Sequence, residues 1–226
     1  MAESLAPSGG APVASHRIAE AIADRILSGR LAPGARIKQD EIAEEFQTSR
    51  IPVREALRIL HSRGLVSLKA NSGAWVSKMD LHDLSMSYKI RERVEPLLLL
   101  DSLPNLTAAD VDEMRRLQGL IEAGTEVDEF LVLDRQLHWA SYRGHRSPEL
   151  AAMVARLWDT TQAYRRAFTR LAVNQRSWII SAEHNLLIEA VAADDAETAA
   201  SVLEMHIRRT RLELQQHPEL FPANRG

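Results

Sequence analysis

Residues 39–64, QDEIAEEFQTSRIPVREALRILHSRG, constrain what this chain can fold into more than any other stretch. Apolar residues recur there at helical spacing in two short runs, with polar residues between them. Ser49 is placed to cap the second run, and Pro52 falls in its first turn, where a missing N–H costs nothing. The pattern predicts two helices joined by a tight turn.

The outward face of the second predicted helix carries Arg50, Arg54 and Arg58 at positions i, i+4 and i+8. Such a stripe is often only the solvated face of an amphipathic helix. It is also what a helix in the DNA major groove needs, because a guanidinium can hold a phosphate or pair with O6 and N7 of guanine. The stripe alone leaves both interpretations open.

A predicted hairpin follows these two helices. Residues 65–69 and 74–76 are β-prone, and the turn sequence Ala-Asn-Ser-Gly separates them. Helix, helix and hairpin in this order form a winged helix-turn-helix, which favours the DNA-binding interpretation of the arginine stripe.

At this point residues 31–66 resemble the amino-terminal DNA-binding domain of the GntR family of bacterial transcription regulators. Pro33-Gly34, the Ser-Arg-x-Pro-Val-Arg-Glu-Ala-Leu segment at residues 49–57 and Gly-Leu-Val at residues 64–66 carry the resemblance. It implies DNA contacts from the second helix, and a glycine at the wing tip lets the backbone approach the minor groove. The predicted DNA-binding residues are Ser49, Arg50, Arg54, Arg58, Lys69 and Gly73.

One position departs from that family pattern. Where the family usually has an acidic residue followed by a basic one that often touches DNA, this chain has Gln39 and Asp40. Asp40 would repel a phosphate, so we do not count it among the DNA contacts. Lys38 or Lys69 is expected to supply the missing positive charge.

Length and charge indicate two domains with different surfaces. Residues 1–78 hold 11 Lys/Arg and 8 Asp/Glu, a net charge of +3, whereas the remainder holds 17 and 23, a net charge of −6. The sign asymmetry places the nucleic-acid surface in the amino-terminal part. We expect a disordered tail over residues 1–15, a winged helix-turn-helix domain over 16–78 and a helical domain over 79–226.

The composition also bears on the compartment. Cysteine is absent, which excludes disulfides and thiolate metal ligands and fits a reducing cytosol. No apolar run approaches the roughly 20 residues of a membrane span, and the first residues lack the cationic start and apolar stretch of a signal peptide. We expect a cytoplasmic protein that does not contact membranes.

The carboxy-terminal part shows no strand pattern. A first helix is predicted over residues 16–28, and after the hairpin six amphipathic helices are predicted over 81–102, 107–123, 126–142, 147–170, 175–192 and 195–216. Val173-Asn174 is one of the turn signals between them. The predicted fold is therefore mainly α: an N-terminal winged helix-turn-helix followed by a C-terminal all-helical antiparallel bundle, whose interior can hold a metal or ligand.

Four side chains can meet inside this bundle. Asp134 and His138 are four residues apart on one helical face, about 6 Å from each other. His184 and His206 lie 11 residues before and after a predicted turn at residue 195, so they can face each other across a helical hairpin. One carboxylate and three imidazoles suit a divalent transition metal such as Zn, Ni, Mn or Fe. The other histidines, His16, His61, His82, His145 and His217, are expected to be surface or hydrogen-bonded core residues.

The same residues resemble the metal-binding pattern of the FadR-type carboxy-terminal ligand-binding (FCD) domain. Asp134-x-x-x-His138, Glu183-His184 and the segment ending at His206 carry this resemblance, together with Arg91-x-x-x-Glu95. It implies a small organic acid as effector at the open metal positions. The candidate effector-binding residues are Arg91, Trp158, Thr161 and Asn185; for Arg91 an intrahelical pair with Glu95 remains an equal alternative.

We therefore expect a regulator that binds a double-stranded DNA operator as a homodimer, most simply as a repressor. The acid bound at the metal is expected to control this binding. Two alternatives remain open. The metal can itself be the signal, or the open metal can activate water in a hydrolase. The hydrolase lacks an obvious base, because Glu183 projects about 100° away from the neighbouring His184 on the helix.

Overall fold

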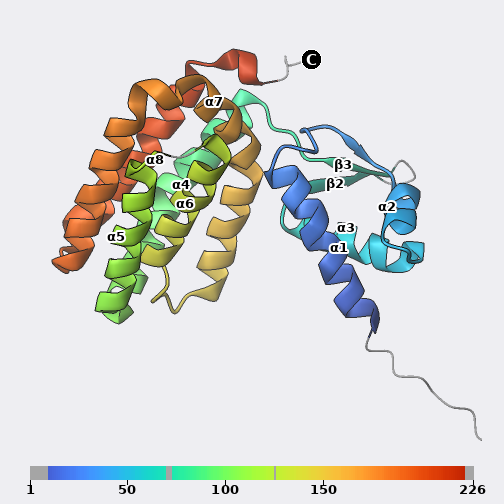
Figure 1. Cartoon of the computed structure of the whole chain (residues 1–226), viewed down its shortest axis with the longest axis horizontal. Helices are drawn as coiled ribbons and strands as arrows, with labels where there is room; N and C mark the ends of the chain where they lie inside the picture. Colours follow the sequence, from blue (N-terminus) through green and yellow to red (C-terminus); the bar gives the residue numbers. More distant parts are fainter. Residues whose placement is uncertain (1–9, 70–72, 125, 222–226) are drawn as a thin grey trace, which may run out of the picture. The chain divides into compact units, whose positions relative to one another are not determined.

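The computed structural model describes residues 10–69, 73–124 and 126–221, with the side chains of residues 10–12 and 172–177 left out of the description. The chain divides into two compact units, Met1–Lys78 and Met79–Gly226, which are considered separately (Figure 1). Helices dominate both units, and within the described residues only the first contains a sheet. The predicted fold class is confirmed.

The first unit packs three helices, α1 (Gly10–Leu27), α2 (Gln39–Glu45) and α3 (Arg50–Ser62), around one apolar core. The predicted amphipathic face of α3 is buried, whereas its arginines are exposed. The start of α1 corrects a prediction: residues 10–15 are helical and Ser15 is buried, so the helix extends into the expected tail. Pro12 does not prevent this because it falls in the first turn. Residues 1–9 of the expected tail lie outside the described part.

A small antiparallel sheet completes this unit. Its strands are β1 (Arg36–Ile37), β2 (Val66–Lys69) and β3 (Gly73–Val76), in the order β1-β3-β2. Val66 pairs with Val76 and Lys69 with Gly73, which confirms the predicted hairpin. The tip of its turn, residues 70–72, lies outside the described part. The short strand β1 was missed because two residues show no periodicity.

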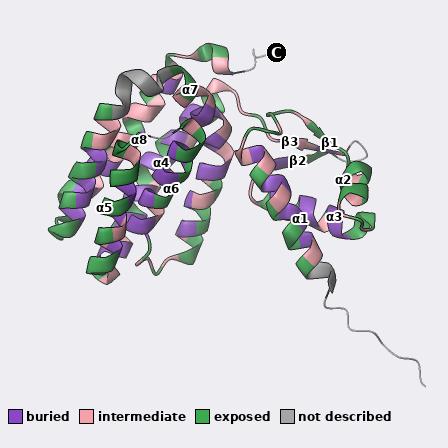
Figure 2. Ribbon diagram, viewed as in Figure 1, coloured by how far each residue is buried: buried purple, intermediate pink, exposed green. Residues whose placement is uncertain are grey.

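The second unit is a helical bundle of α4 (Leu81–Ser102), α5 (Ala108–Glu122), α6 (Val127–Ser141), α7 (Pro148–Ala192) and α8 (Ala196–Gln215), with short 3₁₀ turns at Leu103–Asn105 and Pro218–Leu220. Leucines, methionine and aromatic residues fill its interior, where Figure 2 shows the inward faces of the helices buried. A capping box at Thr107 begins α5: its hydroxyl accepts from the Asp110 N–H, and the Asp110 carboxylate accepts from the Thr107 N–H. No helix among the described residues is long and apolar enough to cross a membrane.

The helix α7 differs from the prediction of two helices separated at residues 173–174. The helix runs on without interruption, because no glycine or proline lies between its start and its end. It is not straight, however. Arg165 and His184 both contact Asp134, although a straight helix would separate them by about 28 Å. The helix therefore bends between these residues, and its two arms, yellow and orange in Figure 1, pack on the same interior.

Candidate functional site

Four side chains from three helices converge inside the bundle: Asp134 and His138 from α6, His184 from the second arm of α7, and His206 from α8. One nitrogen or oxygen of each lies within 4.8 Å of those of the others. Asp134, His138 and His184 are each only 1% exposed. The helical spacing and the α7–α8 hairpin thus bring together the four residues that the sequence pattern predicted.

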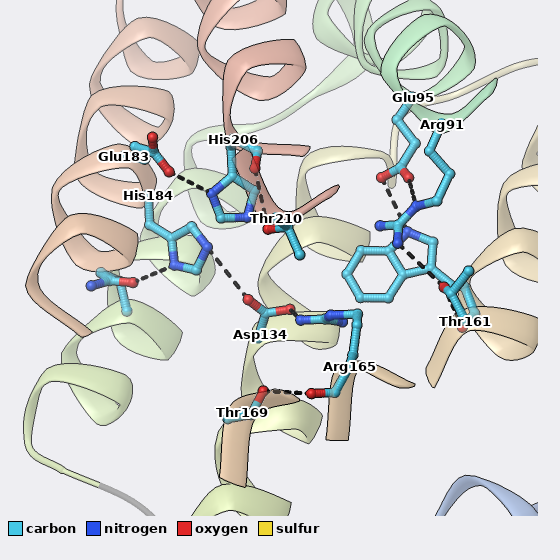
Figure 3. A network of polar contacts seen from close by, with 12 residues as sticks. Arg91, Glu95, Asp134, Thr161, Arg165, Thr169, Glu183, His184, His206 and Thr210 are labelled. Atoms are coloured by element: carbon cyan, nitrogen blue, oxygen red, sulfur yellow. Dashed lines mark hydrogen bonds and ion pairs between the residues drawn. The ribbon is translucent and has the colours of Figure 1, made fainter. Parts of the chain in front are cut away.

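Neighbouring side chains orient the ligand atoms (Figure 3). The Nδ1 of His184 lies 2.9 Å from Gln118 Oε1, and the Nδ1 of His206 lies 2.8 Å from Glu183 Oε2. Because both partners are hydrogen-bond acceptors, each Nδ1 carries the proton and each Nε2 keeps its lone pair. Such outer hydrogen bonds to histidine are typical of metal sites.

Two buried ring nitrogens of these four residues also have no hydrogen-bond partner among the described residues, namely His138 Nδ1 and His184 Nε2. The latter faces Asp134 Oδ1 at 3.5 Å, while Arg165 donates to Asp134 Oδ2 at 2.7 Å. An unpartnered buried nitrogen is costly unless it binds something. The arrangement therefore fits a bound cation.

Burial sets the charge of this cluster. It lowers the pKa of His184 to about 3 and that of His206 to about 4, and it holds the pKa of His138 well below its usual value. Burial alone would raise the pKa of Asp134, but the Arg165 guanidinium and the three imidazoles outweigh it, so the pKa is lowered. At neutral pH the site offers three neutral imidazoles and one carboxylate, which are the protonation states that a divalent metal requires.

A small cavity adjoins these ligands. It is lined by Tyr88, Arg91, His138, Trp158, Arg165, His206, Ile207 and Thr210. Two of these side chains belong to the metal-binding cluster, and two are arginines. Tyr88 Oη and Arg165 Nη1 are buried without a hydrogen-bond partner among the described residues. The cavity therefore presents unsatisfied donors and positive charge beside the candidate metal.

The second candidate surface is the outward face of α3. Arg50, Arg54 and Arg58 are all exposed there. Arg58 pairs with Glu55 at 2.9 Å, Arg50 pairs with Asp40 of α2, and Arg54 makes no ion pair or hydrogen bond among the described residues. Arg54 is thus free to meet a ligand.

Three other predicted DNA-binding residues lie at the ends of helices or strands in the same unit. Ser49 occupies the N-cap position of α3, but its side chain makes no capping hydrogen bond. Gly73 begins β3 with φ of +110°, in the region that favours glycine. The ammonium of Lys69 lies 5.3 Å from the centre of the Trp75 ring.

Two family models match the chain: the bacterial regulatory proteins of the gntR family over residues 14–76 and the FCD domain over residues 86–209. The chain belongs to the GntR family of transcription regulators. It carries the family's DNA-binding domain followed by an FCD domain, and this membership makes it a regulator of transcription and not an enzyme.

Relatives and solved structures agree with this assignment to the GntR family. An HTH-type transcriptional regulator in an unstable DNA locus of Streptomyces ambofaciens is 31% identical over 88% of this chain and 86% of its own. A probable D-xylose utilization operon transcriptional repressor of Paenarthrobacter nicotinovorans is 31% identical over 84% of each chain. The solved structure of E. coli McbR/YncC has the same fold, with a TM-score of 0.78 over 90% of this chain and 98% of its own at 24% identity.

Within the FCD domain, the intrahelical pair of Arg91 with Glu95 is present, and effector binding by Arg91 stays a prediction. Arg91 pairs with Glu95, as an intrahelical partner would, and it also lines the cavity. Glu95 is fully buried and accepts two further hydrogen bonds, from Tyr142 Oη at 2.8 Å and from Trp158 Nε1 at 3.1 Å. The Arg91 guanidinium lies 4.4 Å from the centre of the Trp158 ring, which fixes one wall of the cavity.

The other two predicted effector-binding residues, Thr161 and Asn185, lie in different places. Thr161 lies beside Arg91, with 3.4 Å between its Oγ1 and Arg91 Nη1. Asn185 was placed wrongly: it is exposed and donates to Glu122 at 2.8 Å, away from the cavity. Its position next to His184 misled the prediction, because consecutive helical residues point about 100° apart.

Sequence reasoning missed the residues that support the ligands. Arg165 lies on the first arm of α7, and its separation from Asp134 in the sequence did not indicate that the two side chains meet. Gln118 comes from α5, which contributes no ligand. Glu183 was expected to point away from the site; it does point away from His184, but it then contacts His206 on the neighbouring helix and pairs with Arg209.

Proposed function

We propose that this protein is a FadR-like repressor whose operator binding is controlled by a small carboxylate bound at a divalent metal, Zn, Ni, Mn or Fe, in the FCD domain. The observation that carries the proposal is the set of Asp134, His138, His184 and His206, whose ligand atoms lie within 4.8 Å of one another with their imidazoles neutral. Four protein ligands leave two coordination positions open on a six-coordinate metal such as Ni, Mn or Fe, whereas Zn would have to expand beyond its usual four ligands to accept the acid.

The cavity supports an anionic effector. A carboxylate that entered it would reach the metal beside His138 and His206, and Arg91 and Arg165 would supply charge at low dielectric. The small volume of the cavity favours a short acid. A metal-responsive regulator without an effector would leave the Tyr88 hydroxyl and Arg165 Nη1 without a use among the described residues, whereas an acid could accept hydrogen bonds from both.

In the DNA-binding domain, Arg50, Arg54 and Arg58 would enter the major groove, with Ser49 and Lys69 on phosphates and Gly73 at the minor groove. One recognition helix gives too little contact for operator specificity, so a homodimer on a pseudo-palindrome is expected, in the cytoplasm where the chromosome lies.

Control requires that the effector bind the DNA-competent and DNA-incompetent states with different affinity. In this proposal the protein represses transcription, and the effector relieves the repression. The hydrolase alternative has no support, because Glu183, the carboxylate next to His184 in the sequence, is already held by His206 and Arg209.

Native mass spectrometry and elemental analysis of full-length protein purified without chelator test this proposal. We expect a dimer with about one metal per chain and a co-purified small acid. His184→Ala should lose the metal, whereas the control His217→Ala, on a residue that pairs with Glu219 outside the cluster, should keep it. A wild-type protein that takes up neither Zn, Ni, Mn nor Fe would refute the metal site.

DNA affinity separates the two regulatory mechanisms. Operator binding is titrated with metal at fixed acid, and with acid at fixed metal. A response to metal alone would favour the metal sensor over the proposal. Arg54→Ala should cost roughly 1–3 kcal/mol of operator discrimination, and the control Arg116→Ala in the FCD domain should cost none. An unchanged footprint for Arg54→Ala would contradict the recognition-helix assignment.

A further inference from the structure

Asp40 is the position where this chain departs from its family, and the structure gives this residue a partner. Its carboxylate Oδ1 forms an ion pair with Nε of Arg50. Asp40 lies in the first turn of α2, and Arg50 is the first residue of α3. The pair therefore links the two helices of the helix-turn-helix on the side that carries the arginine stripe.

The pair has no visible role in folding. The Arg50 side chain is 72% exposed and that of Asp40 is 68% exposed, and neither belongs to the apolar core of the unit. Exposed ion pairs of this kind contribute little to stability. A carboxylate at this place also opposes DNA binding in general, since it lies beside a surface that must approach phosphates. Its presence needs another explanation.

The geometry of the contact leaves Arg50 able to read a base. A guanidinium has five N–H donors, and Asp40 occupies the one on Nε. The four on the terminal nitrogens remain, and two of them suffice for O6 and N7 of guanine. A free arginine must lose much of its rotamer freedom on binding. A carboxylate that holds Nε beforehand reduces that loss and favours one orientation.

We propose that Asp40 and Arg50 act as one base-reading unit, in which Asp40 orients the Arg50 guanidinium toward a guanine in the major groove instead of leaving it to bind any phosphate. Asp40 is thus a positioning residue for sequence specificity. It lowers affinity for DNA in general and raises the preference for one base pair in each half-site.

Glu41 provides a matched control. It is the next residue in the same first turn of α2, its side chain is 66% exposed, and it pairs with Lys38 within its own segment instead of with α3. Asp40→Asn and Glu41→Gln remove the same charge from the same helix end. They differ in the cation that loses its partner, which is Arg50 of the arginine stripe in the first variant and Lys38 in the second.

The experiment is selection from a pool of random DNA duplexes by the full-length protein, followed by affinity measurements on duplexes with single base-pair changes and on a scrambled duplex. Arg50→Ala should lose between about 5-fold and 150-fold of preference at one base pair. Asp40→Asn should lose about 3-fold or more at that same base pair while binding the scrambled duplex more tightly. Glu41→Gln should bind the scrambled duplex more tightly with the base preference unchanged. In the double variant, Asp40→Asn should add nothing to the loss caused by Arg50→Ala.

Two results would overturn the proposal. In the first, Asp40→Asn behaves like Glu41→Gln, with a uniform gain in affinity and the wild-type preference, so Asp40 acts only as a charge. In the second, Asp40→Asn changes the preference at a base pair that Arg50→Ala leaves alone, so Asp40 reads a base by itself. Both side chains are exposed, and circular dichroism of each variant checks that the fold is intact.

Discussion

Individual histidines in the bundle interior behave differently from exposed ones because burial penalises their charged form. The pKa of His184 is about 3 and that of His206 about 4, against about 6.5 in an unfolded chain. Below pH 6.5 the unfolded state therefore binds more protons than the folded state, and the free energy of unfolding decreases as the pH is lowered. The contribution to stability is complete above pH 6.5 and is lost as the pH falls toward these lowered values.

We therefore expect the metal-free protein, kept in chelator, to lose about 2 kcal/mol of stability for each of these two histidines between pH 7 and pH 5. Urea denaturation of the bundle at a series of pH values measures this loss. The double variant His184→Gln/His206→Gln should show a flatter profile. A wild-type profile that is equally flat would mean that the imidazoles are not excluded from water.

Glu183 offers a second prediction at the residue scale. Its carboxylate oxygen Oε2 lies 2.8 Å from Nδ1 of His206 and holds the proton on that nitrogen. The Nε2 lone pair therefore stays available to the proposed metal. Glu183→Gln removes the charge that makes His206 a better donor, and it should weaken metal binding roughly 10- to 100-fold. Competition with a chromophoric chelator measures the affinity. Glu189→Gln, which changes an exposed glutamate on the same arm of α7, should have no effect.

Among the elements, the turn between α6 and α7 is held closely against the end of α4. The N–H of Gly144 donates to Ser102 Oγ at 2.9 Å, and its carbonyl accepts from Asn105 Nδ2 at 2.9 Å. A Cβ at this glycine would lie 2.4 Å from the Ser102 carbonyl oxygen, a backbone atom that cannot move aside. This close approach positions α6, which carries Asp134 and His138, relative to the first arm of α7.

Gly144→Ala should therefore destabilise the bundle by about 1–3 kcal/mol or more through overpacking. Gly119→Ala is the matched comparison, because that glycine lies inside α5 with nothing within 4 Å of an added Cβ. It should be neutral or stabilise the protein by about 0.5–1 kcal/mol, since alanine favours helix more than glycine does. Thermal or urea denaturation distinguishes the two. Equal stabilities would show that the turn can shift at no cost.

At the scale of the whole molecule, the proposed homodimer needs a surface of its own. The outer face of α4 exposes Met86, Ile90, Leu97 and Leu100, each at least 38% exposed and all at helical spacing. Exposed apolar side chains gathered on one helix face are found at protein–protein interfaces, and here the exposed Arg93 divides them into two pairs. In a symmetric dimer this face of α4 from each copy can pack on the other.

Leu97→Glu should shift the protein from dimer to monomer in sedimentation velocity and weaken operator binding, because a monomer occupies one half-site only. Val132→Glu is the control: Val132 is similarly exposed, at 54%, but lies on α6. If Leu97→Glu remained dimeric, the copies would meet through another face.

Sequence alone determined most of the elements and much of the chemistry. The apolar spacing around Val53 and Leu57 and the turn residues near Gly73 depend on neighbours along the chain, so the helix-turn-helix and its hairpin were predictable. The four metal-binding candidates were also found, because α6 and the α7–α8 hairpin place them by helical rise alone.

Only the tertiary structure decided which other side chains support the site. Arg165 reaches Asp134 from the first arm of α7, and Gln118 reaches His184 from a helix that contributes no ligand. The partner of Asp40 was equally hidden, since it depends on how α2 crosses α3. Each of these contacts joins residues whose separation in the sequence has no fixed relation to their distance in space. The periodicity of the sequence predicts which face of a helix or strand a residue occupies, whereas tertiary packing determines which residues that face contacts.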